Sequence, residues 1–237
     1  VPGGPFLSEK AISPAATKAL EAKYGLDKPM AERYFTYISD AAHGDFGDSL
    51  KQRGRTVMDI IATKFPVSAR LGGMAVVLAL CVGVPLGVLA AYKRGTFIDS
   101  LFSVIATCGI AVPGFVICTL LLYVFGVKLQ WLPTLGLKSA QSYIMPVVAL
   151  AAYPTSYIMR LMRSSMLDVL GQDYMRTAKA KGLSQKVSLF KHALRNAILP
   201  VITYVGPMLA YTLTGSFVTE KIFTIPGLGG EFIKAIN

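Results

Sequence analysis

Residue types that perform catalysis or bind metals are few in this chain and widely separated. His43 and His192 are the only histidines among its 237 residues. The three cysteines, Cys81, Cys108 and Cys118, all lie in long apolar runs, where an odd number of thiols favours neither a disulfide framework nor a metal site. We interpret them as small hydrophobic residues in helix packing. No phosphate-binding loop of the form GxxxxGK[ST] occurs, so we do not expect this chain to hydrolyse ATP.

The chemically active side chains are instead cations gathered in residues 160–195. The basic residues there are Arg160, Arg163, Arg176, Lys179, Lys181, Lys186, Lys191 and Arg195, and the acidic ones are Asp168 and Asp173. Such a segment can meet acidic groups on a partner protein, where charge mainly guides encounter and orientation. An ordinary loop on the positive side of a membrane has the same composition. Charge alone therefore leaves both interpretations open.

The elements that must position this segment are apolar. Hydrophobic residues make up 53% of the chain and charged residues only 16%, against about a quarter in soluble domains. Residues 71–92, 100–127, 139–159 and 196–219 contain no charged residue. About 20 helical residues cross the ~30 Å hydrocarbon layer of a bilayer. The sequence therefore predicts an all-α integral membrane protein, a polytopic helix bundle with four spans.

The basic residues also predict the orientation of these spans. Lys and Arg gather in short cytoplasmic loops, so loops 93–99 and 160–195 are expected inside the cell and residues 1–65 outside. His43 and His192 then lie on opposite sides and cannot share a metal. The net charge of +11 follows from this topology, and we expect no nucleic-acid partner, because the cations flank membrane spans. The abrupt ends suggest a fragment that lacks spans on both sides.

Residues 1–65 are predicted to form an extracytoplasmic segment with short helices, and 66–237 the transmembrane domain. Ser13 and Pro14 are typical of a helix start, and Gly25 of its end. A second helix is expected over 29–42, ended by Gly44. The segment could be a small cap on the membrane domain or a platform for an external delivery protein, and the sequence favours neither.

The predicted spans contain no ionisable residue at mid-depth, which argues against an ion-coupled carrier. They contain several prolines, which can kink membrane helices: Pro85, Pro113, Pro146, Pro154, Pro200 and Pro207. Gly83 and Gly87 are four residues apart, so they share a helix face and are expected to allow close packing.

Within the basic segment, residues 173–195 predict a helical hairpin. Residues 173–181 are expected to form a short helix with Tyr174 and Ala178 on one face. Gly182 suits the left-handed position after its end, and Ser184 can cap a second helix. The small residues Ala178 and Ala180 keep the first helix thin enough to enter a groove on a partner.

The hairpin resembles the coupling motif of ABC importer permeases, whose general pattern is E-A-A, three residues, then Gly. Only Ala178 and Gly182 match that pattern, because Arg176 stands in place of Glu. The chain is more similar to the oligopeptide/dipeptide/nickel permease subfamily, which it resembles in RTAKAKGL at 176–183 and HALRNAILP at 192–200. HGDFGDS at 43–49, FPVSARLG at 65–72 and IPGLG at 225–229 extend the resemblance over nearly the whole chain.

The resemblance implies a multi-pass subunit of the inner or plasma membrane, surrounded by lipid, with six spans when complete, of which this chain would hold spans two to five. It implies a second homologous permease, two ABC ATPase subunits that bind ATP and Mg, and an extracytoplasmic substrate-binding protein. The chain itself would be no enzyme and would bind no cofactor. The implied ATPase-coupling residues are Tyr174, Arg176, Thr177, Ala178, Lys179, Ala180, Gly182, Leu183 and His192.

Peptides are the first substrate that the resemblance suggests, and nickel or another small solute is the alternative. A secondary transporter or channel is a more distant alternative, and it would need no ATPase. A membrane hydrolase would need a nucleophile beside a base, yet no histidine lies within a predicted span. A passive scaffold would move no solute. The sequence does not identify the residues that line a substrate pathway.

Overall fold

The computed structural model describes residues 27–49, 51–52, 54–184 and 187–236. Regular structure within these ranges is helical, apart from one isolated antiparallel bridge between Asp48 and Thr56. The all-helical fold predicted from the sequence is confirmed. The chain divides into two compact units, Val1–Thr63 and Lys64–Asn237, and the boundary falls within the long helix α3 (Val57–Tyr92).

In the first unit, α2 (Met30–Ala42) follows Pro29 and confirms the helix predicted over 29–42. Gly44 has a positive φ of 84° just after its end, as a glycine at a helix stop permits. Lys28 lies 2.9 Å from Glu32 on the first turn, and this hydrogen-bonded carboxylate raises the pKa of Lys28. The helix predicted between Ser13 and Gly25 lies outside the described residues.

The second unit contains the apolar helices. Among the residues that the structure describes, three helical stretches are long and apolar enough to cross a membrane: Val57–Tyr92, Ala140–Leu170 and Leu199–Ile222. The second comprises the 3₁₀ turn η2 (Ala140–Tyr143) and helix α6 (Ile144–Leu170). The third comprises α10 (Leu199–Leu213) and the short α11 (Phe217–Ile222).

The span predicted over 100–127 is sharply bent at Pro113, one of the prolines expected to kink membrane helices. Helix α4 (Phe97–Ala111) ends before Pro113, and α5 (Gly114–Leu121) continues into a π-helix, η1 (Leu122–Lys128). The two parts are bent by 102°, so they form either a broken span or a re-entrant loop. Pro113 has no N–H to continue the helical hydrogen bonds, and the residue before a proline is pushed to extended backbone; Val112 has ψ 124°.

Helix α6 continues well beyond the predicted end at residue 159. Arg160 and Arg163, which we assigned to a loop, lie on this helix. The Arg163 guanidinium makes two hydrogen bonds to the Asp99 carboxylate at the start of α4, at 2.6 and 2.8 Å, and Asp99 also accepts from the backbone N–H of Gly95 at 3.0 Å. A charge that is paired and hydrogen-bonded can lie against apolar neighbours. Counting charges along the sequence cannot detect this pairing.

The helices of the second unit pack closely through glycines, as predicted. A Cβ on Gly83 would lie 2.8 Å from the carbonyl oxygen of Thr155, and one on Gly87 would lie 2.6 Å from that of Met159. These two glycines therefore let α3 approach α6 at near-backbone distance. A core cluster runs along this contact and extends to the chain after residue 188: Val76, Ala79, Val88, Ala91, Ile158, Met162, Met166, Met175, Ala193, Ala197, Val201 and Met208.

Glu220 on α11 is fully buried, with 1% of its surface exposed. Its carboxylate accepts hydrogen bonds from the Ser68 hydroxyl at 2.7 Å and from the backbone N–H of Gly230 at 3.0 Å. Ser68 in turn accepts from the N–H of Leu228 at 2.8 Å, at the start of α12 (Leu228–Ile236). We call Glu220, Ser68 and the first turn of α12 the carboxylate cradle. It joins the sequence motifs FPVSARLG and IPGLG, which are distant along the chain.

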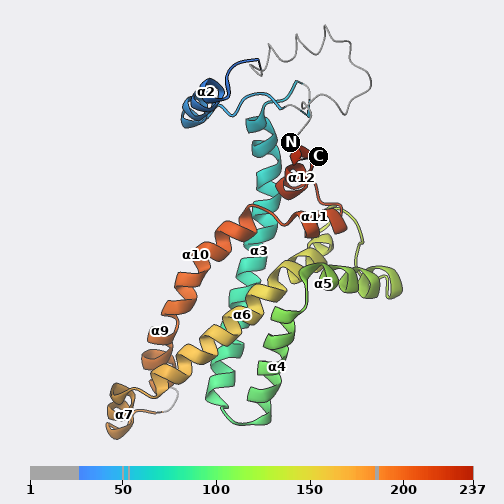
Figure 1. Ribbon diagram of the computed structural model, residues 1–237. Coiled ribbons are helices and arrows are strands. Elements are labelled where there is room, and N and C mark those ends of the chain that lie inside the picture. Colours follow the sequence, from blue (N-terminus) through green and yellow to red (C-terminus); the bar gives the residue numbers. More distant parts are fainter. Residues whose placement is uncertain (1–26, 50, 53, 185–186, 237) are drawn as a thin grey trace. The chain divides into compact units, whose positions relative to one another are not determined.

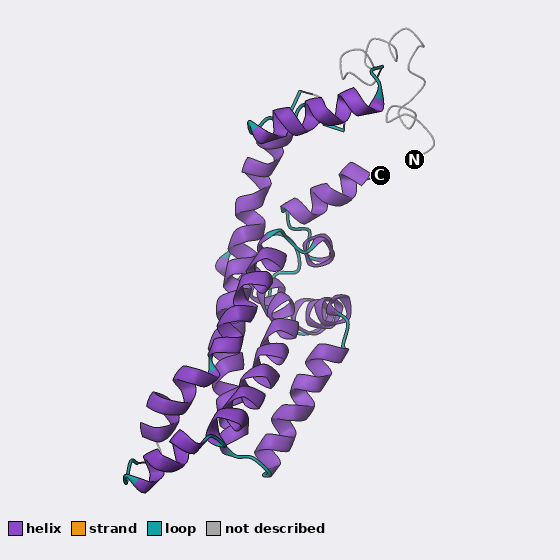
Figure 2. Ribbon diagram, turned by 60° about the vertical axis from the view of Figure 1, so that its left-hand side comes forward, coloured by secondary structure: helices purple, strands orange, loops and turns teal. Residues whose placement is uncertain are grey.

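The second unit has two distinct ends. Figures 1 and 2 show the turn between α3 and α4 at the same end as the segment labelled α7, whereas α11 and α12 lie toward the other end. The two loops that we predicted to share the inner side of the membrane therefore do lie at one end of this unit.

Candidate functional site: the basic hairpin

The first arm of the hairpin is α7 (Asp173–Ala180), close to the predicted helix over 173–181. Asp173 is in its first turn, where a carboxylate complements the helix dipole, and it lies 3.7 Å from the Arg176 guanidinium. The Thr177 hydroxyl donates to the carbonyl of Asp173 at 3.2 Å. Arg176 is mostly exposed, so its charge is available at the surface.

The inner face of α7 is held by packing. Met175 has 1% of its surface exposed and belongs to the core cluster that contains Met162 and Met166 of α6. Ala178, also buried, shares this face. We had placed Ala178 on one face with Tyr174, but Tyr174 is partly exposed and Met175 is its buried neighbour. The sequence analysis missed Met175, although its apolar character three residues before Ala178 is a usable signal.

The Tyr174 hydroxyl accepts a hydrogen bond from the Asn196 side chain at 2.8 Å. Asn196 lies in the second arm, on the helix α9 (Leu194–Ala197), and also bonds the carbonyl of His192 at 3.3 Å. This bond ties the two arms together across 22 positions in the sequence. We had predicted no role for Asn196, because a polar residue on an exposed helix shows no periodic signal.

The turn between the arms requires a glycine. Gly182 has φ +76°, in the left-handed region that L side chains rarely adopt. A Cβ there would meet no atom within 4 Å, so strain rather than crowding excludes other residues. The N–H of Leu183 bonds the carbonyl of Ala178 at 3.3 Å, which closes the end of α7. The predicted left-handed glycine is confirmed.

The second arm differs from the ordinary α-helix that we expected. The Ser184 hydroxyl accepts from the N–H of Val187 at 3.4 Å, as predicted for a cap, but residues Ser188–Ala193 form a π-helix, η3. π-turns interrupt α-helices and are frequent at functional sites. Ser188 is buried, and its hydroxyl has no hydrogen-bond partner within the described chain.

The outer face of the hairpin is open. Tyr174, Arg176, Thr177, Ala180, Gly182 and Leu183 are all exposed, whereas Ala178 is buried and His192 is half-buried. The side chain of Lys179 lies outside the described part of the chain. The structure thus gathers most of the predicted coupling residues on one projecting hairpin, and their contact with an ATPase stays a prediction.

Comparison with known proteins agrees with this architecture. The family model of binding-protein-dependent transport system inner membrane components matches residues 83–237, more than half of the chain. The dipeptide transport system permease protein DppB of Bacillus subtilis is 46% identical over the whole chain, which covers 77% of that protein. The oligopeptide transport system permease protein OppB of Salmonella typhimurium is 44% identical, with 78% of it covered.

The chain belongs to the family of binding-protein-dependent transport system inner membrane components. The family predicted from the hairpin motifs is therefore confirmed. The chain is a multi-pass inner-membrane permease subunit of an ABC importer, which in general works with an ATPase and a substrate-binding protein.

A solved structure described as an amino acid ABC transporter with histidines resembles this permease, with a TM-score of 0.54. The similarity covers 76% of this chain and 79% of that one. At 17% identity it supports the fold alone.

Proposed function

We propose that this permease subunit imports oligopeptides or dipeptides and forms half of the translocation pathway. The substrate class rests on relatives that are named dipeptide and oligopeptide transport permeases at 40–46% identity over the full chain. One structural observation supports the coupling role: α7 buries Met175 in the core of the spans while its opposite face stays exposed. A partner can therefore grip the exposed face and act on the spans through the buried one.

We propose that the exposed face of the hairpin docks in a groove on an ABC ATPase subunit. Arg176 and Lys179 would meet acidic groups there, and Thr177, Ala180 and Leu183 would contact its walls. Tyr174, Ala178, Gly182 and His192 would hold the shape of the hairpin. The sequence has no phosphate-binding loop, so ATP and Mg would bind on the partner subunits and this chain would carry no cofactor.

The proposed motion follows from packing. Closure of an ATPase pair around nucleotide would displace α7, and Met175 would pass the displacement to Met162 and Met166 of α6 and to Val88 of α3. Close-packed cores transmit such shifts because they rearrange between discrete states rather than deform continuously. The spans would then open the pathway alternately to each side of the membrane.

The proposed assembly contains a second homologous permease, two ATPase subunits and an extracytoplasmic binding protein. Residues 160–195 would lie in the cytoplasm and residues 1–65 outside, where the delivery protein binds. The Lys and Arg of loops 93–99 and 160–195 support this orientation, because such residues gather in cytoplasmic loops.

Reconstitution tests this function. The full complex is placed in liposomes with its binding protein, and uptake of labelled di- and oligopeptides is measured with ATP or with a non-hydrolysable analogue. We expect peptide uptake and peptide-stimulated ATP hydrolysis only with ATP. Uptake of nickel without peptide uptake would contradict the proposed substrate. Peptide uptake driven by an ion gradient, without ATPase subunits, would contradict the proposed energy source.

A further inference from the structure

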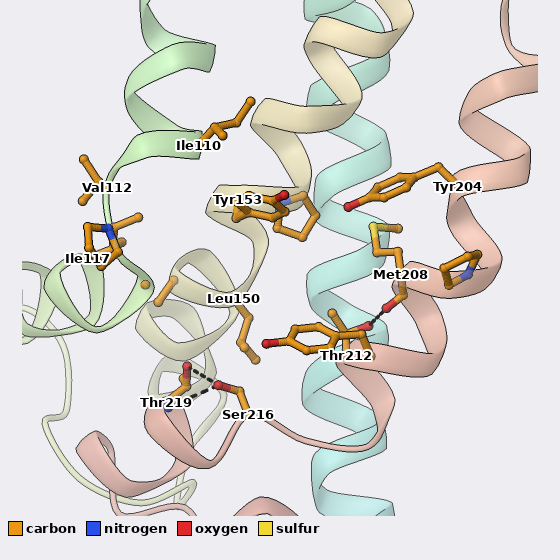
Figure 3. A pocket seen from close by; sticks show the side chains of 16 residues that line it. Ile110, Val112, Ile117, Leu150, Tyr153, Tyr204, Met208, Thr212, Ser216 and Thr219 are labelled. Carbon is orange, nitrogen blue, oxygen red and sulfur yellow. Dashed lines mark hydrogen bonds between the residues drawn. The ribbon is translucent and has the colours of Figure 1, made fainter.

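A cavity of about 570 Å³ lies in the second unit, between the α4–α5 bend and helices α6, α10 and α11 (Figure 3). Its size is within the ~300–1,000 Å³ typical of small-molecule sites. Ile110 and Pro113 line it at the bend, Leu150 and Tyr153 on α6, and Tyr204 on α10. The cavity thus adjoins the two helices that continue to the basic hairpin.

Two kinds of polar group reach this cavity. The hydroxyls of Thr212, Ser216 and Thr219 are already hydrogen-bonded within the protein. The hydroxyls of Tyr153, Tyr204 and the largely exposed Tyr211 make no hydrogen bond within the described residues. Figure 3 shows those of Tyr153 and Tyr204 directed toward one another. A tyrosine hydroxyl both donates and accepts, so these two groups are free to bind a ligand.

The tyrosine rings are fixed by stacking. Tyr157 packs against both rings, with its ring centroid 6.3 Å from that of Tyr153 and 4.4 Å from that of Tyr204. Aromatic pairs at such separations stabilise one another beyond their simple burial. These ring contacts restrict the positions of the two hydroxyls in the wall of the cavity.

No charged side chain is among the described residues that line the cavity. A site that recognised charged side chains of a substrate would require an opposite charge. A peptide backbone presents N–H and C=O groups whatever its side chains are. Hydroxyls between apolar walls can hydrogen-bond to these backbone groups without distinguishing the side chains of the peptide.

We propose that this cavity is the section of the import pathway in which the permease binds the peptide backbone, through the hydroxyls of Tyr153 and Tyr204. The proposal rests on the proposed peptide import and assigns its pathway residues. Tyr204 packs on the same core cluster as Met175 of the hairpin, and Met208 of the cavity wall belongs to that cluster. Displacement of the hairpin therefore changes the cavity, which couples ATPase closure to release of the backbone.

Removal of the hydroxyls is the first test. In the reconstituted complex, the double variant Tyr153→Phe/Tyr204→Phe keeps the rings and removes both hydroxyls. We expect peptide uptake at limiting peptide to fall roughly 5- to 150-fold, as the loss of two hydrogen bonds of ordinary strength predicts. Tyr123→Phe is the matched control, because Tyr123 is exposed and does not line the cavity, and it should transport like wild type.

The second test alters the backbone of the transported peptide. Wild type should transport a tripeptide faster than its N-methylated analogue, and the double variant should lose most of this difference. The inference would be overturned if wild type transports the peptide and the double variant transports it equally fast, with the same preference for the unmethylated tripeptide. A wild-type complex that transports no peptide would instead overturn the proposed function, so the two failures are distinguishable.

An introduced charge tests whether peptides pass through the cavity. Leu150→Glu places a carboxylate in the wall, and Leu150→Gln is its neutral match. We expect the ratio of lysine-rich to glutamate-rich peptide uptake to rise at least several-fold in the Glu variant and to stay unchanged in the Gln variant. An unchanged ratio, or loss of the second permease from the purified Glu complex, would overturn the inference and indicate a subunit interface instead.

Discussion

The basic hairpin and the carboxylate cradle lie toward opposite ends of the second unit, and they use charge in opposite ways. The hairpin exposes Arg176 to solvent with only a 3.7 Å contact to Asp173. The cradle buries Glu220 and satisfies its carboxylate with the Ser68 hydroxyl and a backbone N–H. Exposed cations are available to a partner protein, whereas the buried carboxylate is already occupied within the chain. The hairpin is therefore suited to binding a partner, whereas the cradle stabilises the fold.

The largest expected effect is on stability at the cradle. Glu220→Ala leaves the Ser68 hydroxyl and the Gly230 N–H without their partner, and hydrogen bonds to charged groups contribute about 1.5–3 kcal/mol each. We expect a loss of about 3 kcal/mol or more, measured by thermal unfolding of the detergent-solubilised complex. Asp168→Ala, at an exposed position, should unfold like wild type. Equal stability of the Glu220 variant would contradict the structural role of the cradle.

The ion pair between Asp99 and Arg163 should give the next largest effect. Asp99→Asn removes the charge that faces a partly buried guanidinium, and we expect a loss of about 1–3 kcal/mol, because Arg163 keeps some access to solvent. A double-mutant cycle with Arg163→Met isolates the pair. A coupling energy near zero would mean that the two hydrogen bonds contribute nothing to stability.

In the hairpin we expect loss of coupling rather than loss of stability. Gly182→Val forces a β-branched residue into the left-handed region, at a cost of about 1–2 kcal/mol, and misplaces the arms. Substrate-stimulated ATP hydrolysis should fall sharply while the melting temperature changes by only a few degrees. Gly182→Asn is the matched control, since Asn tolerates this backbone conformation, and it should retain most of the coupling. Normal coupling in the Val variant would refute the assigned turn.

The smallest effect is expected from the exposed charges. Arg176→Glu combined with Lys179→Glu should weaken ATPase association, by less than about 1 kcal/mol for each exposed charge pair, and more at low salt than at high salt. Co-purification of the ATPase across a salt series measures this. Lys128→Glu, at an exposed position outside the hairpin, should leave association unchanged. Unaltered co-purification of the double variant at every salt concentration would exclude these contacts.

Local patterns predicted the hairpin well. The residue pattern from Asp173 to Lys181 predicted the first helix. Gly182 predicted its left-handed end, because few residues other than glycine adopt a positive φ. The sequence also predicted the glycine contacts of Gly83 and Gly87, since their spacing alone places them on one helix face. In each case the signal lies within one turn or one helix.

Long-range pairs were not predictable from such patterns. Arg163 was assigned to a loop, but it lies on α6 and pairs with Asp99, which is 64 positions away in the sequence. Glu220 accepts a hydrogen bond from Ser68, which is 152 positions away in the sequence, and no periodic pattern relates the two residues. Pro113 was predicted as a possible kink, but the size of the bend was not predictable, because a proline in an apolar run permits either a kink or a full break. Which occurs depends on neighbouring helices.

Cysteine cross-linking tests the central claim most directly. In a chain whose Cys81, Cys108 and Cys118 are replaced, Ala180→Cys places one thiol on the exposed face of α7. A short bifunctional reagent should join it to an ATPase subunit of the assembled complex, with a yield that changes when nucleotide binds. Labelling of this thiol by a membrane-impermeant reagent from the outside of intact cells, without any cross-link to the ATPase, would contradict the account.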